Sequence, residues 1–140
     1  MKTFRNLAVG YDGSLDSTIA VRWALRAARE VDATVTIVHA TGLLEHLRAR
    51  YSPDVLPPEL LGLAKEYAFD ESRLRWLVTN GDAFSVLLRM ACAPVNADAL
   101  VVGSRGEGKR DGLLLGSTSL EVAEHATVPV VVVPSTYVDH

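Results

Sequence analysis

The chain has 140 residues and a formal net charge of -3, with 49% apolar and 22% charged residues. This composition is that of an ordinary globular protein, and the length suits one domain over residues 1–140. The acidic balance argues against nucleic acid or an anionic membrane as a partner. No apolar run reaches the length of a membrane span, so we expect a cytoplasmic protein.

The amino-terminal half alternates apolar runs with helical patterns. Residues 4–10 predict a strand, and Ser14 or a neighbour begins a helix whose apolar positions recur at helical spacing. That stripe consists of Ile19, Ala20, Trp23, Ala24, Ala27, Ala28 and Val31. Residues 34–40 are rich in β-branched side chains and predict a second strand. Prolines make the next stretch irregular, before a short helix over about residues 58–69.

The third strand is expected at residues 73–79. Asn80, Gly81 and Asp82 form a turn into a helix that runs through about Ala93. The single cysteine, Cys92, falls in that apolar helical stretch. We therefore expect its thiol to be buried and inert.

Two further strands, at residues 97–102 and 128–133, flank a helix over residues 120–127. Strands that alternate with helices predict an α/β fold, here a Rossmann-like, doubly wound, five-stranded parallel sheet with helices on both faces. We take the strand order as 3-2-1-4-5. The order then reverses between strands one and four, and ligands of such sheets bind at the carboxyl ends of the strands at this point.

A glycine pattern follows the fourth strand. The pattern G-x2-G-x9-G-[ST] is formed by Gly103, Gly106, Gly116 and Ser117. Glycine lets the backbone approach a ligand, and a helix N-terminus favours phosphate through its N–H groups and dipole. Thr118 and Glu121 have the spacing of a capping box, which would mark the helix start. The loop is thus a candidate phosphate site; the alternative is that its glycines only make turns.

Part of the same loop imitates a P-loop. Gly103, Gly108 and Lys109 match G-x4-G-K, but Arg110 stands where the motif needs Ser or Thr to hold magnesium. We therefore reject a P-loop. The cations Arg105, Lys109 and Arg110 either reach phosphate oxygens or stay solvated.

The loop after the first strand carries a second candidate group. The Asp12 carboxylate can accept hydrogen bonds from an exocyclic amine or a ribose hydroxyl. The alternative is that Asp12 or Ser14 caps the following helix, and both roles can hold together. In the expected strand order this loop faces the glycine loop across one crevice.

These features together resemble the ATP-binding branch of the universal stress protein family. The resemblance rests on the Asp12 loop, residues 37–40, residues 98–103, the glycine pattern and the final Val-Pro-Val strand. It implies that ATP is the ligand, with magnesium or manganese neutralising the phosphates; AMP or cyclic AMP is the alternative. It also implies that Gly103 contacts ribose and that the backbone of Ala40 touches adenine. The residues expected at the nucleotide are Tyr11, Asp12, Ser14, Ala40, Val102, Gly103, Arg105, Gly106, Gly116, Ser117 and Thr118.

Residues 12–18 also resemble the S-G-G-x-D-S motif of PP-loop ATP pyrophosphatases. The match holds at Gly13, Asp16 and Ser17 but fails at Asp12 and Ser14. An acid at the first position would place negative charge where a phosphate should sit. An adenylating PP-loop enzyme stays as the alternative function. In one respect the chain departs from the stress-protein pattern, because the stretch 41–72 is short, which puts the second helix in doubt.

No general base stands out in the glycine loop, so we expect a regulatory nucleotide-binding protein with slow or no ATP hydrolysis. The valines 130–133 lie between Pro129 and Pro134 and form an edge strand in the expected order. Exposed apolar edges are usually covered, which predicts a homodimer through residues 128–133. Cover by the tail, residues 135–140, is the alternative.

Overall fold

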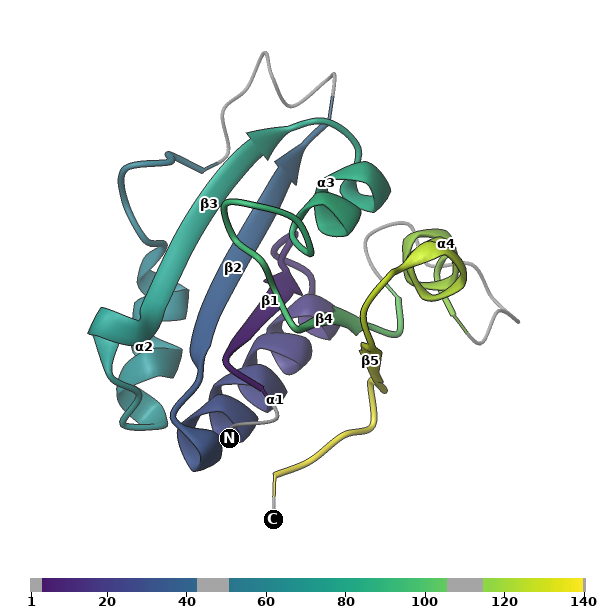
Figure 1. The fold of residues 1–140 in the computed structure, drawn as a ribbon. Helices are drawn as coiled ribbons and strands as arrows, with labels where there is room; N and C mark the ends of the chain where they lie inside the picture. Colours follow the sequence, from purple (N-terminus) through teal and green to yellow (C-terminus); the bar gives the residue numbers. More distant parts are fainter. Residues whose placement is uncertain (1–3, 43–50, 106–114, 140) are drawn as a thin grey trace.

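The computed structural model describes residues 4–42, 51–105 and 115–139. Within these residues five parallel strands form one sheet in the order β3-β2-β1-β4-β5 (Figure 1). The strands are β1 (Asn6–Gly10), β2 (Thr34–Thr41), β3 (Leu74–Asn80), β4 (Ala99–Gly103) and β5 (Val130–Val133). The predicted fold and strand order are confirmed, and each strand lies within two residues of its expected bounds.

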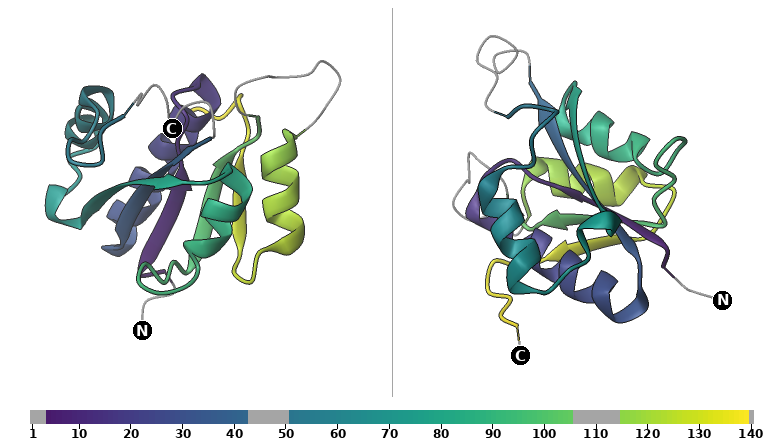
Figure 2. Two further views of the ribbon diagram at one scale, coloured as in Figure 1. Left: turned by 90° about the horizontal axis from the view of Figure 1, so that it is seen from above. Right: turned by 90° about the vertical axis from the view of Figure 1, so that its left-hand side faces the viewer.

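Helices cover both faces of the sheet. Figure 2 shows α1 (Leu15–Val31) and α2 (Pro58–Glu66) on one face, with α3 (Ala83–Arg89) and α4 (Ser117–His125) on the other. A 3-10 turn, η2 (Glu71–Arg73), leads into β3. The chain therefore winds one way from β1 through β3 and the other way from β4 to β5.

The core is divided into two layers by the sheet. Successive strand residues point to opposite faces, so Leu7 and Val9 pack with α1 and α2 while Ala8 packs with α3 and α4. Val9 is paired with Ile37 of β2 and Val101 of β4, which places β1 at the centre of the sheet. Burial on both faces explains why the central strands are nearly continuous apolar runs.

The first helix begins where the sequence predicts. Ser14 is its N-cap, and the Ser14 Oγ accepts a hydrogen bond from the Ser17 N–H at 3.2 Å. The fully buried apolar residues are Ala20, Val21, Ala24, Leu25 and Ala28. The predicted stripe missed Val21 and Leu25, and it wrongly included Val31, which is 40% exposed. The helix ends at Val31, and Asp32 turns the chain into a left-handed conformation with φ 55°.

The second helix, which the short stretch 41–72 put in doubt, does form. Pro58 stands in its first turn, where the missing N–H costs no hydrogen bond. Leu60, Leu63 and Ala64 bury one face against the core. The helix ends at Glu66, three residues earlier than expected.

The third helix ends at Arg89 rather than near Ala93. In the next three residues each backbone N–H donates to the carbonyl three residues earlier, as in a 3-10 turn, instead of four residues earlier. The Cys92 N–H, for example, donates to the Arg89 carbonyl at 3.0 Å. Cys92 therefore lies beyond the helix, where its side chain is exposed. The expectation of a buried thiol was wrong.

None of the helices in residues 4–42, 51–105 and 115–139 has the length and apolar character that crossing a membrane requires.

Gly103, at the end of β4, is in very close contact with the first turn of α1. A Cβ at this position would lie 2.6 Å from the Asp16 carbonyl oxygen and 2.8 Å from the carbonyl carbon. These are helix backbone atoms, which cannot move aside without displacing α1. The packing of α1 on β4 therefore requires glycine here, independently of any ligand.

We predict that Gly103→Ala lowers the free energy of unfolding by about 1–3 kcal/mol, the usual cost of overpacking a core. Gly62→Ala is the matched control, because Gly62 lies within α2 with no atom within 4 Å of its would-be Cβ. That change should be neutral or add about 0.5–1 kcal/mol. Urea unfolding measures both. Equal midpoints for Gly103→Ala and the parent would contradict the close contact.

Candidate functional site

Segments far apart in the sequence meet at the carboxyl edge of β1, β2 and β4. The strand order reverses between β1 and β4, and the helices that follow these strands, α1 and α4, pack on opposite faces of the sheet (Figure 1). This edge carries ten of the eleven residues predicted to contact a ligand, namely Tyr11, Asp12, Ser14, Ala40, Val102, Gly103, Arg105, Gly116, Ser117 and Thr118. The eleventh, Gly106, lies outside the described residues, as do Gly108, Lys109 and Arg110 of the rejected P-loop.

The Asp12 loop is a tight turn before α1. The Asp12 Oδ1 accepts a hydrogen bond from the Ser14 N–H at 2.9 Å, and Gly13 has a positive φ of 84°. The Asp12 N–H in turn donates to the Ser17 Oγ at 3.3 Å. Ser14 therefore caps the helix and Asp12 forms an Asx turn. A carboxylate can accept about four hydrogen bonds, so this turn is compatible with a second, ligand-binding role for Asp12.

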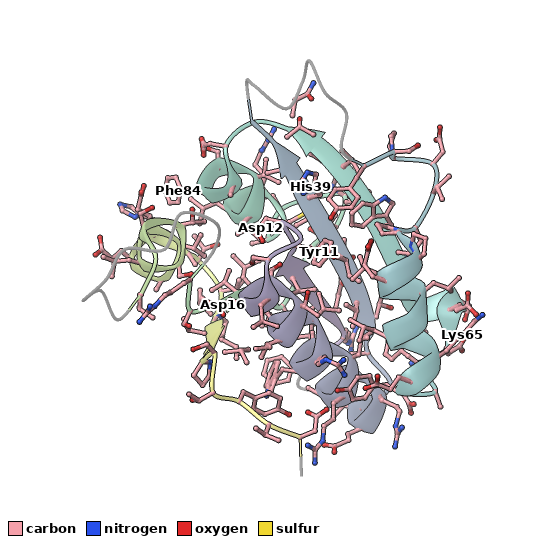
Figure 3. All side chains as sticks on the ribbon, turned by 180° about the vertical axis from the view of Figure 1, so that it is seen from behind. Tyr11, Asp12, Asp16, His39, Lys65 and Phe84 are labelled. Carbon is pink, nitrogen blue, oxygen red and sulfur yellow. The ribbon has the colours of Figure 1, made fainter. Side chains whose placement is uncertain are left out.

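Tyr11, the residue before Asp12, is hydrogen-bonded to β2 through both its N–H and its carbonyl group. The Tyr11 N–H donates to the Val38 carbonyl at 2.9 Å, and the His39 Nδ1 lies 2.8 Å from the Tyr11 carbonyl oxygen. Because a carbonyl only accepts, this ring nitrogen carries the proton and donates. Figure 3 shows Tyr11 and Asp12 near the start of α1, with His39 on the neighbouring strand. The position of the Asp12 loop thus depends on β2 as well as on β1.

The start of α4 is joined to the end of β4 by two short hydrogen bonds. The Gly116 N–H donates to the Ser104 carbonyl at 2.6 Å, and the Ser119 Oγ donates to the Gly103 carbonyl, also at 2.6 Å. Ser119 is buried. Sequence reasoning missed this role because Ser119 stands in a run of hydroxyl residues with nothing to separate it from Ser117.

In the described part of the chain, the N-terminus of α4 has no side-chain cap. Gly116 is the N-cap residue, and Thr118 is the second residue of the helix. The predicted capping box of Thr118 with Glu121 is therefore wrong, since a capping box needs its first residue at the N-cap. The first N–H groups of a helix have no partner within the helix, and within the described part of the chain no capping side chain accepts from those of α4.

The two helices that begin at this edge differ in charge. The α1 start has a side-chain cap from Ser14 and the acids Asp12 and Asp16 close by, whereas the first turn of α4 has no acid. A helix N-terminus carries about half a positive charge, which acids next to it offset. An anion is therefore favoured at α4, near Arg105, and a hydrogen-bond donor is favoured at Asp12.

No group of three or more His, Cys, Asp or Glu side chains in residues 4–42, 51–105 and 115–139 is arranged to hold a metal ion.

An aromatic cluster lies beside the Asp12 loop. Tyr51 contacts three other rings, with centroid distances of 5.8 Å to Tyr11, 4.7 Å to His39 and 5.8 Å to Trp76. Burial raises the pKa of the Tyr11 phenol well above its ordinary value, as does a hydrogen bond with Tyr51. Sequence reasoning did not find this cluster, because Tyr51 stands in an irregular segment without any periodic signal.

Comparison with known proteins gives a consistent result. The model of the Universal stress protein family matches residues 3–134. A universal stress protein of Mycolicibacterium smegmatis is 33% identical over 138 residues, which cover 91% of this chain and 47% of that protein. One from Mycobacterium tuberculosis is 29% identical over 150 residues, covering 91% and 46%. The chain thus spans about half the length of these curated relatives.

A solved structure has the same fold. It is the crystal structure of a universal stress protein in complex with cAMP, 27% identical to this chain, with a TM-score of 0.72. The similarity covers 95% of this chain and 98% of the other.

Proposed function

Because this chain belongs to the universal stress protein family, we propose that it binds an adenine nucleotide at the carboxyl edge of β1 and β4. The observation that carries the proposal is the contrast between the two helix N-termini at this edge. One has a side-chain cap and acids around it, whereas the other, among the described residues, has no side-chain cap and no acid in its first turn. A family member of similar structure holds cAMP, which supports a nucleotide ligand.

The same contrast sets the direction of the nucleotide. The phosphates lie at the first turn of α4, against Gly116, Ser117 and Thr118, where the helix dipole favours negative charge. The adenosine lies towards Asp12, whose carboxylate accepts from an amine or a hydroxyl, and towards Ala40 at the end of β2. The reverse direction would bring the phosphates next to two acids, which is unfavourable.

We propose ATP as the ligand, with magnesium or manganese held by its phosphates and water. AMP and cyclic AMP are the alternatives, and the cAMP-bound family member favours the second of these. The role is regulatory, with slow or no ATP hydrolysis. We do not retain the PP-loop alternative, because the family model assigns the chain elsewhere and because Asp16, the acid of that motif, is fully buried in α1.

We also propose a homodimer through β5. Among the described residues β5 pairs only with β4, through hydrogen bonds from the Leu100 N–H to the Pro129 carbonyl (2.9 Å) and from the Ser104 N–H to the Val133 carbonyl (3.0 Å). In a parallel ladder alternate residues bond to alternate sides, so the backbone groups of Val130 and Val132 point to the outer edge. A second copy of β5 would satisfy them.

Two features favour β5 over the opposite edge of the sheet. At that edge the Trp76 Nε1 donates to the Ser52 carbonyl at 2.9 Å, which holds the segment before α2 against β3. The tail after β5 turns towards α1 and α2 instead, where Asp139 contacts the Tyr67 hydroxyl and lies 3.7 Å from the Arg26 guanidinium. The described tail residues 135–139 therefore reach α1 and α2 through Asp139 instead of pairing with the outer edge of β5.

Titration calorimetry with ATP, AMP and cyclic AMP tests nucleotide binding, and Gly116→Val tests the site. Gly116 has φ -68° and ψ 160°, which valine adopts readily, so the fold should be kept. The branched side chain would stand where the phosphates approach the backbone. We expect at least about a tenfold loss of ATP affinity, or 1.4 kcal/mol, with a smaller loss for Gly116→Ala. Absence of binding of all three nucleotides to the parent at millimolar concentration would overturn the proposal.

Asp12→Asn separates the two roles of Asp12. The amide oxygen can still accept from the Ser14 N–H, so the turn and the free energy of unfolding should be preserved. Adenosine, which carries no charge, should bind about tenfold or more weakly, because a hydrogen bond to a charged group is worth about 1.5–3 kcal/mol. Calorimetry with adenosine and urea unfolding provide the two readouts. Unchanged adenosine affinity would leave Asp12 as a turn residue only.

Val132→Pro tests the dimer. Proline removes the N–H of Val132, which points to the outer edge, and it keeps the hydrogen bonds that the neighbouring residues make to β4. Edge strands tolerate proline at such an outward-facing position. We expect light scattering to report a dimer for the parent and a monomer for this variant. Val138→Pro places the same substitution in the exposed tail and should remain dimeric. A parent that is monomeric at micromolar concentration would exclude the interface.

A further inference from the structure

We infer that Tyr51 is a positioning residue that holds the Tyr11–Ser14 loop in the geometry that adenosine requires, an inference that rests on the proposed nucleotide site. Tyr51 precedes α2 and is distant in sequence from the loop. It would set the affinity for the adenosine part of the ligand and leave the phosphate part unaffected.

The first step is the central place of Tyr51 among the aromatic rings. Its ring meets the edge or face of three others, at interplanar angles of 52° with Tyr11, 77° with His39 and 82° with Trp76. Tilted and edge-to-face pairs at these distances are the favourable arrangement for aromatic rings. Tyr11 and Trp76 also contact each other, at 6.4 Å. Removing the Tyr51 ring would therefore leave three rings without a common neighbour.

The second step connects this cluster to the Asp12 loop. Two of the rings that Tyr51 contacts belong to residues that hold the peptide between Tyr11 and Asp12. His39 donates a hydrogen bond to the Tyr11 carbonyl, and Tyr11 itself precedes Asp12. His39 and Tyr11 are both buried, at 2% and 5% exposure. A shift of either ring would therefore move the backbone that aims the Asp12 carboxylate.

The third step is the anchor of Tyr51 itself. The next residue, Ser52, accepts through its carbonyl from the Trp76 Nε1 at 2.9 Å, and its Oγ accepts from the Asp54 N–H at 3.2 Å. This segment is thus fixed to β3 by a hydrogen bond that does not involve the Tyr51 side chain. Truncating Tyr51 should remove the support of the loop while the segment keeps its attachment.

The phosphate end provides the internal contrast. The start of α4 is fixed by the bonds of Gly116 to Ser104 and of Ser119 to Gly103, neither of which touches the aromatic cluster. A loss of support at Tyr51 should therefore affect one half of the ligand only, whereas a general loss of structure would affect both halves.

The test compares Tyr51→Ala with Tyr51→Phe and with Tyr67→Ala. Tyr67 is the matched control, a half-buried tyrosine that packs on the same core and contacts Arg22 and Asp139, away from the Asp12 loop. Calorimetry uses adenosine and inorganic tripolyphosphate as separate probes. We expect Tyr51→Ala to lose about tenfold in adenosine affinity and to keep its tripolyphosphate affinity. Tyr67→Ala should keep both. Tyr51→Phe keeps the ring but loses the hydrogen bond to Tyr11, so it should lose less adenosine affinity than Tyr51→Ala and keep its tripolyphosphate affinity.

Two results would overturn the inference. One is adenosine affinity in Tyr51→Ala equal to that of the parent, and the other is an equal loss for adenosine and tripolyphosphate. Should Tyr51→Ala fail to fold, Tyr51→Leu fills more of the space without a ring and takes its place.

A ligand-free measurement separates this inference from the proposed function. In nuclear magnetic resonance spectra of the free protein, the Ser14 amide, which donates to the Asp12 Oδ1, should exchange its proton with solvent faster in Tyr51→Ala and at the parent's rate in Tyr67→Ala. Failure of the parent to bind adenosine would remove the proposed function, and the exchange rate of this amide would still decide whether Tyr51 positions the loop. An unchanged exchange rate of the Ser14 amide in Tyr51→Ala would exclude that role.

Discussion

The close approach of α1 to β4 at Gly103 is the constraint on which the candidate site depends. On one side of Gly103 the backbone of Asp16 leaves no room for a Cβ, and on the other side the Gly103 carbonyl accepts the Ser119 hydroxyl of α4. One residue at the end of β4 thus contacts the first turn of two helices on opposite faces of the sheet. The proposed site is the region between these helix starts, so the separation of the two starts follows from backbone packing.

Charge then distinguishes the two helix starts that packing brings to one edge. Ser14 occupies the N-terminus of α1 with its own hydroxyl, and Asp12 and Asp16 add negative charge beside it. Among the residues that the structure describes, the N-terminus of α4 has no side-chain cap and its first turn has no acid. The dipoles of the two helices are equivalent, so the side chains alone make one end suited to a donor and the other to an anion. An asymmetric ligand such as a nucleotide matches this arrangement.

The fold was largely predictable from the sequence because it depends on local patterns. Apolar runs, β-branched residues and helix-start residues such as Ser14 act within a few positions, and they placed all five strands correctly. The order of the sheet does not follow from local patterns; it was assumed, and the structure agrees with it. The errors arose where tertiary contacts decide. Cys92 is exposed because α3 ends early, and Thr118 is not a cap because α4 begins at Ser117. The Tyr51 cluster joins segments that are distant in sequence, so no local pattern could indicate it.

Gly103 and Gly116, the two described glycines of the G-x2-G-x9-G-[ST] pattern, are glycine for different physical reasons. Gly103 is required by the packing of α1, which would hold in a protein with no ligand. Gly116 has an ordinary extended conformation that any residue adopts, so conformation does not require glycine there. An Asp, Asn or Ser at this N-cap would stabilise the helix more, because its side chain would accept from the first N–H groups. Glycine forgoes that stabilisation and leaves those groups to an external acceptor. Glycine at this N-cap costs only about a few tenths of a kcal/mol relative to Ser, Asp or Asn, and among the described residues it leaves the first N–H groups of α4 without a side-chain acceptor, which supports the proposed phosphate site.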